Sequence, residues 1–406
     1  MITLADIQAA RARIGGALYE SPCARSETMS QLAKAQVFFK LDNLQMTGSF
    51  KERGALNKLL SLSMEERRRG VIAASAGNHG LAVAFHAQRL GIPATIVMPR
   101  FAPLIKVSWA RRYGAQVILS GIDFDEALAE AQRLQSERSS VFIPAFNDPA
   151  VIAGQGTIGL ELLEQVPHLD AVLVPVGGGG LIGGIAVALK ESGFTGRVLG
   201  VQTERVAGMR AALAAGSPVS LPSATTLADG IAVRRVGDLT LPLVQRYADK
   251  IVTVSEAELA RSILLLLENE KTVVEGAAAA TLAALLNRPL HLQGQTVVLL
   301  LSGGNIDVNV IARVIEKGLV QEGRLSRISL IVTDRPGALA RVSTLIADQG
   351  ANIQEIVHTR GFSRAEIGES EITLTLETFG PAHIAEVLAA LRTAGYQVFE
   401  EQLGPG

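Results

Sequence analysis

The sequence predicts an α/β fold built on parallel sheets, followed by a small α+β domain near its C-terminal end. Between about residues 35 and 315, short apolar runs rich in β-branched residues alternate with longer helical stretches. Repeated strand–helix–strand order of this kind is typical of parallel sheets covered by helices on both faces. A chain of 406 residues also exceeds what one hydrophobic core usually organises, so we expect two or more domains.

Composition supports cores of aliphatic side chains. Hydrophobic residues make up 48% of the chain and aromatic residues only 4%. The strands of parallel sheets are buried on both faces and are rich in Val, Ile and Leu. The low aromatic content therefore agrees with the parallel sheets that the alternating pattern predicts.

The expected elements of this larger region follow one another in regular order. The strand candidates are Gln36–Leu41, Gly70–Ala74, Ala94–Met98, Gln116–Leu119, Ala171–Pro175, Arg197–Gln202, Lys250–Val254 and Thr296–Leu301. The helices expected between them include Gly80–Leu90, Phe124–Leu134, Ile182–Glu191 and Glu256–Glu270. Gly91, Gly114 and Gly196 follow helical stretches, where a left-handed residue ends a helix at little cost.

The pattern changes near 316–326, which is polar and is expected to be a linker or a bridging helix. The domains are therefore expected at 1–320 and 327–402. The later strands are Arg327–Thr333, Asn352–Thr359, Ser370–Glu377 and Gln397–Glu401, and the helices are Gly337–Gln349 and Ala382–Ala394. This β-α-β-β-α-β order is that of a ferredoxin-like domain.

Charge and composition exclude several classes of protein. A net charge of −1 provides no field for steering toward nucleic acid or an acidic membrane. The longest apolar run, Gly276–Leu286, is too short to span a bilayer. The first sixteen residues lack the continuous apolar core of a signal peptide, and the single Cys23 cannot form an intramolecular disulfide. We expect a cytoplasmic protein that binds neither nucleic acid nor membrane.

The first segment that carries chemistry is Thr47–Ala55, which follows an apolar strand and contains Lys51. Lysine is the side chain that forms a Schiff base with an aldehyde cofactor. Its amine must be neutral to attack, so a partly desolvated position favours this chemistry by lowering the pKa. The alternative is a surface lysine in front of a helix.

The second segment, Ser75–Gly80, lies between a buried strand and a helix of small residues. A helix N-terminus at such a turn binds anions and suits an α-carboxylate. Asn78 is placed to contact the ring oxygen of a cofactor. The alternative is a strand-to-helix turn in which Asn78 only caps the helix.

The third segment contains four consecutive glycines, Gly177 to Gly180, after a strand and before a helix. Glycines there let the backbone wrap closely around a phosphate, with the helix dipole behind it. The spacing Gly178-x-Gly180-x-x-Gly183 also matches a dinucleotide fingerprint, and Glu204 follows near the position of a ribose-binding acid. A nicotinamide-dependent dehydrogenase is therefore the competing interpretation.

The fourth segment, Leu300–Asn305, follows the strongly apolar strand at Thr296–Leu301. Ligands of open parallel sheets bind beyond the carboxyl ends of the strands. The hydroxyl of Ser302 is therefore a candidate to hydrogen-bond a neutral ring nitrogen. The alternative is a glycine-rich turn with a capping serine.

Taken together, the four segments resemble the tryptophan-synthase-β-like pyridoxal phosphate (PLP) enzymes of fold type II. The resemblance covers about residues 5–320, implies a two-lobed catalytic region, and is strongest for threonine/serine dehydratases. Lys51 falls on the Schiff-base lysine, Asn78 on the asparagine that contacts the ring hydroxyl, and Ser302 on the residue facing the pyridine nitrogen. Ser75 and His79 fall on the carboxylate-binding loop. The phosphate loop falls on Gly177, Gly178, Gly179, Gly180 and Leu181.

The resemblance implies loss of water from L-threonine, giving 2-oxobutanoate and ammonia, and activity on L-serine, either toward isoleucine or in threonine catabolism. Similar serine racemases carry a second serine in the asparagine loop, where this chain has Ala76. Racemisation needs two opposed acid–base groups, so Ala76 favours elimination. The His79-Gly80-Leu81 sequence departs from the commoner dehydratase version and leaves substrate preference open. A serine racemase or serine-specific dehydratase is the alternative, and no metal site is expected.

The last 80 residues resemble an ACT domain, which binds amino acids in many regulated biosynthetic enzymes. The turns Asp334–Leu339 and Gly350–Ile353 match its signature. The resemblance implies isoleucine or valine as an effector, although some such modules only dimerise. A homodimer or homotetramer is expected from the frequency of these assemblies.

Overall fold

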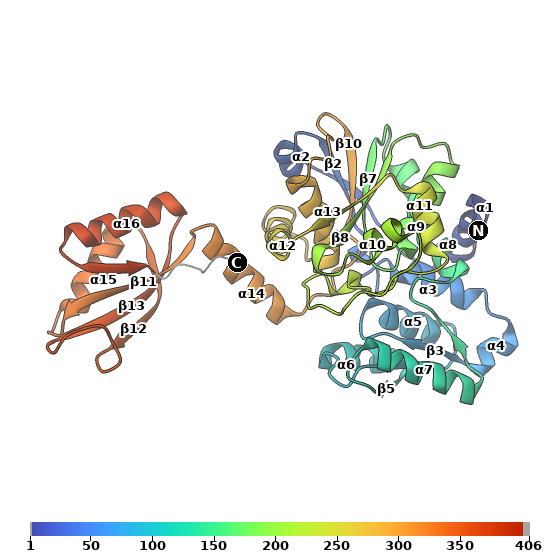
Figure 1. Cartoon of the computed structure of the whole chain (residues 1–406), viewed down its shortest axis with the longest axis horizontal. Helices are drawn as coiled ribbons and strands as arrows, with labels where there is room; N and C mark the ends of the chain where they lie inside the picture. The colour runs from blue at the N-terminus through green and yellow to red at the C-terminus, as the bar shows by residue number, and fades with distance from the viewer. Residues whose placement is uncertain (1, 401–406) are drawn as a thin grey trace. The chain divides into compact units, whose positions relative to one another are not determined.

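The computed structural model describes residues 2–400 and divides into two compact units between Ile306 and Asp307. The first unit contains two sheets with parallel strands and the second contains one antiparallel sheet, shown in Figure 1. The predicted α/β region followed by a small α+β domain is therefore confirmed. The limits expected at 320 and 327 stay a prediction, and the expected ends at Glu401 and 402 lie outside the described residues.

A six-stranded sheet forms the core of the larger lobe of the first unit, in the order β1-β2-β10-β7-β8-β9. All neighbours are parallel except β1 and β2. The central strands β7 and β10 are buried along their whole length. The strands are β1 (Cys23–Ser26), β2 (Gln36–Lys40), β7 (Ala171–Pro175), β8 (Arg197–Thr203), β9 (Lys250–Val254) and β10 (Thr296–Leu300).

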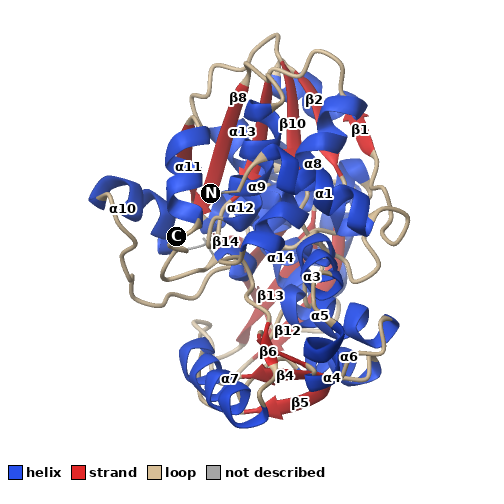
Figure 2. Ribbon diagram, turned by 90° about the vertical axis from the view of Figure 1, so that its right-hand side faces the viewer, coloured by secondary structure: helices blue, strands red, loops and turns tan. Residues whose placement is uncertain are grey.

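Helices cover both faces of this sheet, as Figure 2 shows for the first unit. The helices of the lobe are α1 (Leu4–Ile14), α2 (Glu27–Ala33), α8 (Pro149–Gln165), α9 (Gly180–Glu191), α10 (Gly208–Ala215), α11 (Thr240–Tyr247), α12 (Glu256–Glu270) and α13 (Gly276–Asn287). α9 packs on the sheet with α8 behind it, and α13 packs on the sheet with α12 behind it. Short 3₁₀ turns lie at Asp42–Leu44, Glu204–Val206 and Asp229–Ile231.

The smaller lobe has a parallel sheet in the order β5-β4-β3-β6. α5 and α6 contact it on one side, and α7 contacts β3, β4 and β6 around a separate apolar cluster. The strands are β3 (Val71–Ala74), β4 (Ala94–Met98), β5 (Gln116–Leu119) and β6 (Val141–Phe142). The helices are α3 (Lys51–Leu60), α4 (Met64–Arg69), α5 (Asn78–Arg89), α6 (Leu104–Arg112) and α7 (Phe124–Arg138).

Two strands were not expected from the sequence. β1 has the sequence Cys-Ala-Arg-Ser with two exposed residues in the middle, so no apolar run marks it. It forms because its backbone pairs with the exposed side of β2 at the sheet edge. β6 has only two residues, which pair with Val71 and Ile72.

Helix α3, which begins at Lys51, lies unusually close to α8. A Cβ atom on Gly154 would come within 2.5 Å of the carbonyl oxygen of Arg53 and 2.7 Å of Cα of Gly54. Only glycine at 154 allows the two backbones to approach this closely. The contact holds the start of α3 against the larger lobe.

The second unit begins with α14 (Val308–Gln321), so the first half of the segment expected to be a linker or bridging helix is helical. Its antiparallel sheet has the order β12-β13-β11-β14. The helices α15 (Ala338–Asp348) and α16 (Pro381–Thr393) contribute to a single apolar cluster with it. The strands are β11 (Leu325–Thr333), β12 (Asn352–Thr359), β13 (Glu369–Glu377) and β14 (Gln397–Glu400). None of the described helices is long and apolar enough to cross a bilayer.

Candidate active site

A cavity of about 750 Å³ opens between the two lobes of the first unit. Its walls come from the turns that follow β3, β7 and β10, together with the first residue of α3. These are the carboxyl ends of strands, where open parallel sheets bind ligands. All ten residues predicted for the site line this cavity: Lys51, Ser75, Asn78, His79, Gly177, Gly178, Gly179, Gly180, Leu181 and Ser302.

Lys51 presents its amine to the cavity from the first turn of α3. Burial lowers the pKa of its amine from 10.5 to about 8, and the carboxylate of Glu275 partly opposes this shift. The amine donates a hydrogen bond of 2.9 Å to the carbonyl oxygen of Ala145. An amine with this pKa is half neutral at about pH 8, and its neutral form is the one that a nucleophile or general base requires.

The glycine turn after β7 offers several backbone donors to the cavity. Gly179 has a φ of +94°, which strongly favours glycine, and α9 begins at the next residue. Among residues 2–400, no acceptor is found for the backbone N–H groups of residues 177 to 181. A Cβ on Gly178 would come within 2.4 Å of Phe146, so the turn has no room for side chains. Free N–H groups at a helix N-terminus form an anion site that fits a phosphate.

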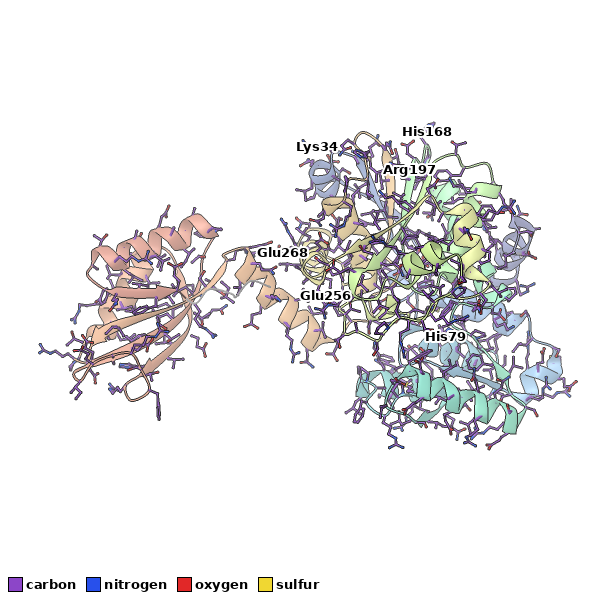
Figure 3. The ribbon with its side chains drawn as sticks, viewed as in Figure 1. Lys34, His79, His168, Arg197, Glu256 and Glu268 are labelled. Atoms are coloured by element: carbon purple, nitrogen blue, oxygen red, sulfur yellow. The ribbon has the colours of Figure 1, made fainter. Side chains whose placement is uncertain are left out.

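The turn after β3 holds Ser75, Asn78 and His79. Burial and the charge of Lys51 lower the pKa of His79 to about 3, so its ring is neutral. His79, labelled in Figure 3, has its Nε2 atom 2.8 Å from the carbonyl oxygen of Ile143. A carbonyl oxygen only accepts, so Nε2 carries the proton. Ser75 accepts a hydrogen bond of 3.2 Å from the backbone N–H of Gly77, which shapes the turn.

Ser302 lies two residues after the end of the buried strand β10 and is 1% exposed. Its carbonyl oxygen accepts a hydrogen bond of 3.0 Å from the backbone N–H of Phe50, so the β10 turn and the start of α3 are joined. Within the described part of the chain, its hydroxyl has no hydrogen-bond partner. The hydroxyl is therefore available to a ligand in the cavity.

Glu275 also lines the cavity, and sequence reasoning missed it. It precedes α13 and is 5% exposed. Both of its carboxylate oxygens lie 2.9 Å from the side-chain nitrogen of Asn78. The signal that could have identified it is a lone acid within an otherwise apolar stretch, Val273–Ala280.

Two ion pairs join the lobes beside the cavity. Lys106 on α6 lies 3.5 Å from Asp229, which belongs to the larger lobe. Arg234 of the larger lobe pairs with Asp125 on α7. All four residues line the cavity, so its entrance depends on contacts between the lobes.

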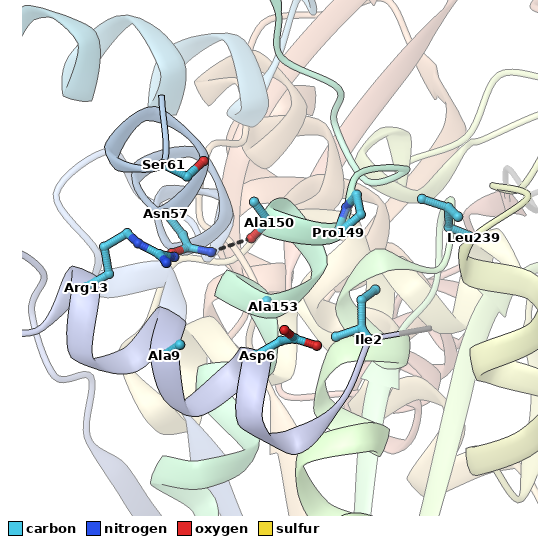
Figure 4. Close-up of a pocket in the computed structure, with 10 residues that line it drawn as sticks. All are labelled: Ile2, Asp6, Ala9, Arg13, Asn57, Ser61, Pro149, Ala150, Ala153 and Leu239. Carbon is cyan, nitrogen blue, oxygen red and sulfur yellow. Dashed lines mark hydrogen bonds between the residues drawn. The ribbon is translucent and has the colours of Figure 1, made fainter. Parts of the chain in front are cut away.

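A second cavity of about 330 Å³, drawn in Figure 4, contains none of the predicted site residues. It lies among α1, α3 and α8, and the hydrogen bond from Asn57 to the carbonyl oxygen of Ala150 crosses its wall. Arg13 in the same wall pairs with Asn57 at 2.5 Å. It contains no lysine amine and no glycine turn, so it lacks the groups that make the larger cavity chemically distinctive. Among residues 2–400, no cluster of three or more His, Cys, Asp or Glu side chains could hold a metal ion.

Comparison with known proteins identifies the family. The family model described as pyridoxal-phosphate dependent enzyme matches residues 14–303, and the ACT domain model matches residues 326–393. This chain belongs to the pyridoxal-phosphate dependent enzymes.

The similarity of this pyridoxal-phosphate enzyme to individual proteins agrees with the family assignment. It is 50% identical to the L-threonine ammonia-lyase of Thermotoga maritima, over 98% of this chain and 99% of that protein. It is 44% identical to the catabolic L-threonine dehydratase TdcB of Escherichia coli strain K12, over 77% of this chain and 96% of that protein. The structure of maize serine racemase superposes with a TM-score of 0.74 at 35% identity, over 79% of this chain and 98% of that one.

The groups around the larger cavity fit the cofactor of this pyridoxal-phosphate enzyme. An amine of lowered pKa suits an aldehyde, and a turn of free N–H groups suits a phosphate. A serine hydroxyl without a partner suits a ring nitrogen. The dinucleotide interpretation is wrong, because the family match runs through the glycine turn and Glu204 does not line the cavity.

Proposed function

We propose that this pyridoxal-phosphate enzyme is a threonine ammonia-lyase, which converts L-threonine into 2-oxobutanoate and ammonia and also acts on L-serine. The observation that carries the proposal is the position of Lys51. Its amine, with a pKa near 8, lines the same cavity as the glycine turn and the Ser302 hydroxyl. The near full-length similarity to a protein named L-threonine ammonia-lyase supports threonine as the substrate.

The residues of the cavity then have distinct roles. Lys51 would hold the cofactor through its amine, and its neutral amine would take the proton from Cα of the substrate as a general base. The backbone N–H groups of residues 177 to 181 bind the phosphate. The hydroxyl of Ser302 would hydrogen-bond the ring nitrogen, and Asn78 would hydrogen-bond the ring oxygen. When bound, the cofactor supplies the conjugated ring that accepts electrons from Cα.

The turn at residues 75–79 binds the carboxylate of the substrate in this proposal. It leads into α5 and includes Asn78 and His79 of the first helical turn, so the helix dipole favours a negative charge there. The neutral ring of His79 is held by Ile143 and keeps the turn in shape without adding a positive charge. Ser75 stabilises the same turn through Gly77.

The second candidate is a serine racemase or a serine-specific dehydratase, and the similarity to maize serine racemase favours it. Racemisation needs a proton donor on each face of Cα. Ala76 lines the cavity at the position where similar racemases have a serine, and its methyl group transfers no proton. The elimination reaction is therefore the first choice.

The finer biological setting is also proposed. An amino-acid effector, isoleucine or valine, would bind the ACT domain and link the enzyme to isoleucine synthesis, whereas a catabolic role would not need it. The match of the ACT model to residues 326–393 supports such an effector. A cytoplasmic location and a homodimer or homotetramer complete the proposal, on the arguments from composition and from the frequency of such assemblies.

The test is a visible spectrum of the purified protein with pyridoxal phosphate, before and after L-threonine is added, together with an assay for 2-oxobutanoate. We expect a visible absorption band at the outset and production of the keto acid. Addition of L-serine and chiral analysis of the remaining amino acid separate the candidates. Formation of D-serine without a keto acid would establish the racemase, and a chain that binds no pyridoxal phosphate would refute both.

A further inference from the structure

The carboxylate of Glu275 is buried without a cation beside it. Among residues 2–400, no Lys, Arg or His lies within ion-pairing distance of Glu275, and its side chain is 5% exposed. It occupies the N-cap position of α13 but makes no side-chain cap there. Its two oxygens instead accept from the side-chain nitrogen of Asn78, at 2.9 Å each. A buried carboxylate without a counter-ion is costly, so a structural role alone explains it poorly.

The contacts of Asn78 form one chain of side-chain amides. The side-chain nitrogen of Asn305 donates a hydrogen bond of 2.7 Å to the carbonyl oxygen of Thr47. The same nitrogen donates a second hydrogen bond, of 2.8 Å, to Oδ1 of Asn78. A backbone carbonyl oxygen only accepts, so the orientation of the Asn305 amide is determined. At the other end an ionised Glu275 only accepts, which makes the nitrogen of Asn78 the donor. The carboxamide of Asn78 is thereby held in one orientation.

Two glycines enclose the carboxylate. A Cβ on Gly303 would lie 2.5 Å from Oε1 of Glu275, and one on Gly230 would lie 3.2 Å from it. The backbone N–H of Glu275 donates a hydrogen bond of 3.0 Å to the carbonyl oxygen of Gly303, the residue next to Ser302. Glu275 is therefore held between the turn after β10 and the loop that contains Gly230. Its side chain has little freedom to move away from Asn78.

We propose that Glu275 is a positioning residue, which holds the carboxamide of Asn78 with its nitrogen as a donor and leaves the second N–H of that nitrogen for the ring oxygen of the cofactor. This inference rests on the proposed roles of Asn78 and Lys51. It goes beyond them because it assigns a role to Glu275, which contacts Asn78 and acts on Lys51 through its negative charge.

The charge of Glu275 acts on the pKa of Lys51, an effect that a purely structural role would not produce. Burial raises the pKa of Glu275 to about 7, and Asp229 adds to the increase. Asn78, Lys106 and Lys51 act in the opposite direction. The negative charge in turn raises the pKa of Lys51 against the effect of burial. Removal of this charge should lower the pKa of the amine that holds the cofactor.

The first experiment compares the full-length wild-type chain with Glu275→Gln, which keeps the size of the side chain but removes the charge and introduces a donor. Equilibrium dialysis gives the dissociation constant of pyridoxal phosphate, and the pH dependence of the visible band gives its midpoint. We expect about tenfold weaker binding and a midpoint about one pH unit lower. Glu258→Gln is the matched control, since Glu258 pairs with Arg288 and does not line the cavity.

The second experiment asks whether Glu275 acts through Asn78. Asn78→Ala should weaken cofactor binding by itself, and adding Glu275→Gln should then weaken it less than about twofold further. The pH midpoint should still shift, because the field at Lys51 does not pass through Asn78. Full additivity of the two losses in binding would overturn the positioning role.

The remaining outcomes are also decisive. Wild-type affinity and an unshifted midpoint in Glu275→Gln would remove the inference and leave the proposed function intact. A wild-type chain that binds no pyridoxal phosphate would refute the proposed function and this inference with it. Should Glu275→Gln fail to fold, as judged by circular dichroism, Glu275→Asp replaces it. That variant keeps the charge but draws the carboxylate back from Asn78, so weaker binding with an unshifted midpoint is expected, and unchanged binding would contradict the proposal.

Discussion

Lys51 depends on its surroundings for its chemistry. A lysine in water is almost fully protonated at pH 8, whereas burial brings the pKa of this amine to about 8. The hydrogen bond to Ala145 directs it along one wall of the cavity. The proposed base is thus prepared by the desolvation of its amine, and Glu275 moderates the effect.

Replacement of Lys51 by alanine should abolish both the visible band and production of 2-oxobutanoate. Loss of the general base alone costs roughly 10²–10⁴-fold in rate, and loss of the attachment to the cofactor adds to this. The matched control is Lys58→Ala, on the same helix, where the amine pairs with Asp148 outside the cavity. Retention of turnover by Lys51→Ala would remove this residue from the mechanism.

The rate should also depend on pH through Lys51. Its pKa is lowered, so the neutral form of the amine increases as pH rises through about 8. We expect kcat to increase between pH 6 and 8 and to level off above the pKa. Steady-state kinetics with saturating L-threonine measure this. A rate that is flat from pH 6 to 9 would show that a different group takes the proton.

Substitution of Ser302 by alanine should impair turnover without loss of the phosphate site. The hydroxyl is the group proposed to meet the ring nitrogen, and it has no other partner among the described residues. A neutral hydrogen bond contributes enough to lower kcat by roughly three- to tenfold. The dissociation constant of pyridoxal phosphate serves as the internal control. An unchanged kcat would show that Ser302 takes no part in the reaction.

At the scale of secondary structure, helix α3 is anchored by buried charge. Arg53, two residues after Lys51, pairs at 2.7 Å with Asp42 and also with Glu161, and all three are nearly fully buried. Lys40 pairs with Glu161 at 2.5 Å, so two cations balance two carboxylates. Burial by itself would raise the pKa of Asp42, but Arg53 lowers it below its usual range. This cluster and the close contact at Gly154 hold the start of α3 in place.

Removal of Arg53 should therefore destabilise the protein strongly. In Arg53→Met the buried carboxylate of Asp42 loses its cation and Glu161 keeps only Lys40, and breaking a buried pair in this way costs about 3–5 kcal/mol. Urea unfolding followed by circular dichroism measures the change. The matched control is Arg11→Met, which breaks the exposed pair with Glu164 and should cost less than about 1 kcal/mol. Equal effects of the two substitutions would contradict the anchoring role.

At the scale of the whole molecule, the groups proposed for catalysis all belong to the first unit. All residues of the cavity precede the division at Ile306. The E. coli relative aligns over 96% of its length with 77% of this chain. The cavity is therefore lined only by residues of the first unit, and none comes from the unit that the ACT model matches.

Deletion of residues 327–406 should leave turnover within about twofold but remove any response to isoleucine or valine. Allosteric coupling is typically about 1–3 kcal/mol, or roughly 5–150-fold in affinity, and a titration of the full chain would detect it. The measurement is the rate of 2-oxobutanoate production against effector concentration in both proteins. A truncated enzyme that still responds would place the effector site in the first unit.

The sequence determined most of the fold because local patterns set the limits of many helices and strands. The helix expected at Glu256–Glu270 has those bounds in the structure, since Ser255 and Glu258 form a capping box at its start. The strands β4, β5, β7, β9 and β12 also agree in both limits. Three strand-end turns and the segment of Lys51 predicted the ten site residues that line one cavity, and the three turns lie together because the ends of parallel strands meet at one edge.

Only the tertiary structure decided what depends on distant partners. β1 lacks a strand pattern and exists because it pairs with β2. Asp42, Arg53 and Glu161 are ordinary charged residues in the sequence, and their balance appears only when α3 packs on α8. Glu275 is separated by 197 residues from Asn78, so no local pattern relates them. Backbone preference and apolar periodicity act over a few residues, whereas the burial and pairing of charges depend on the folded chain.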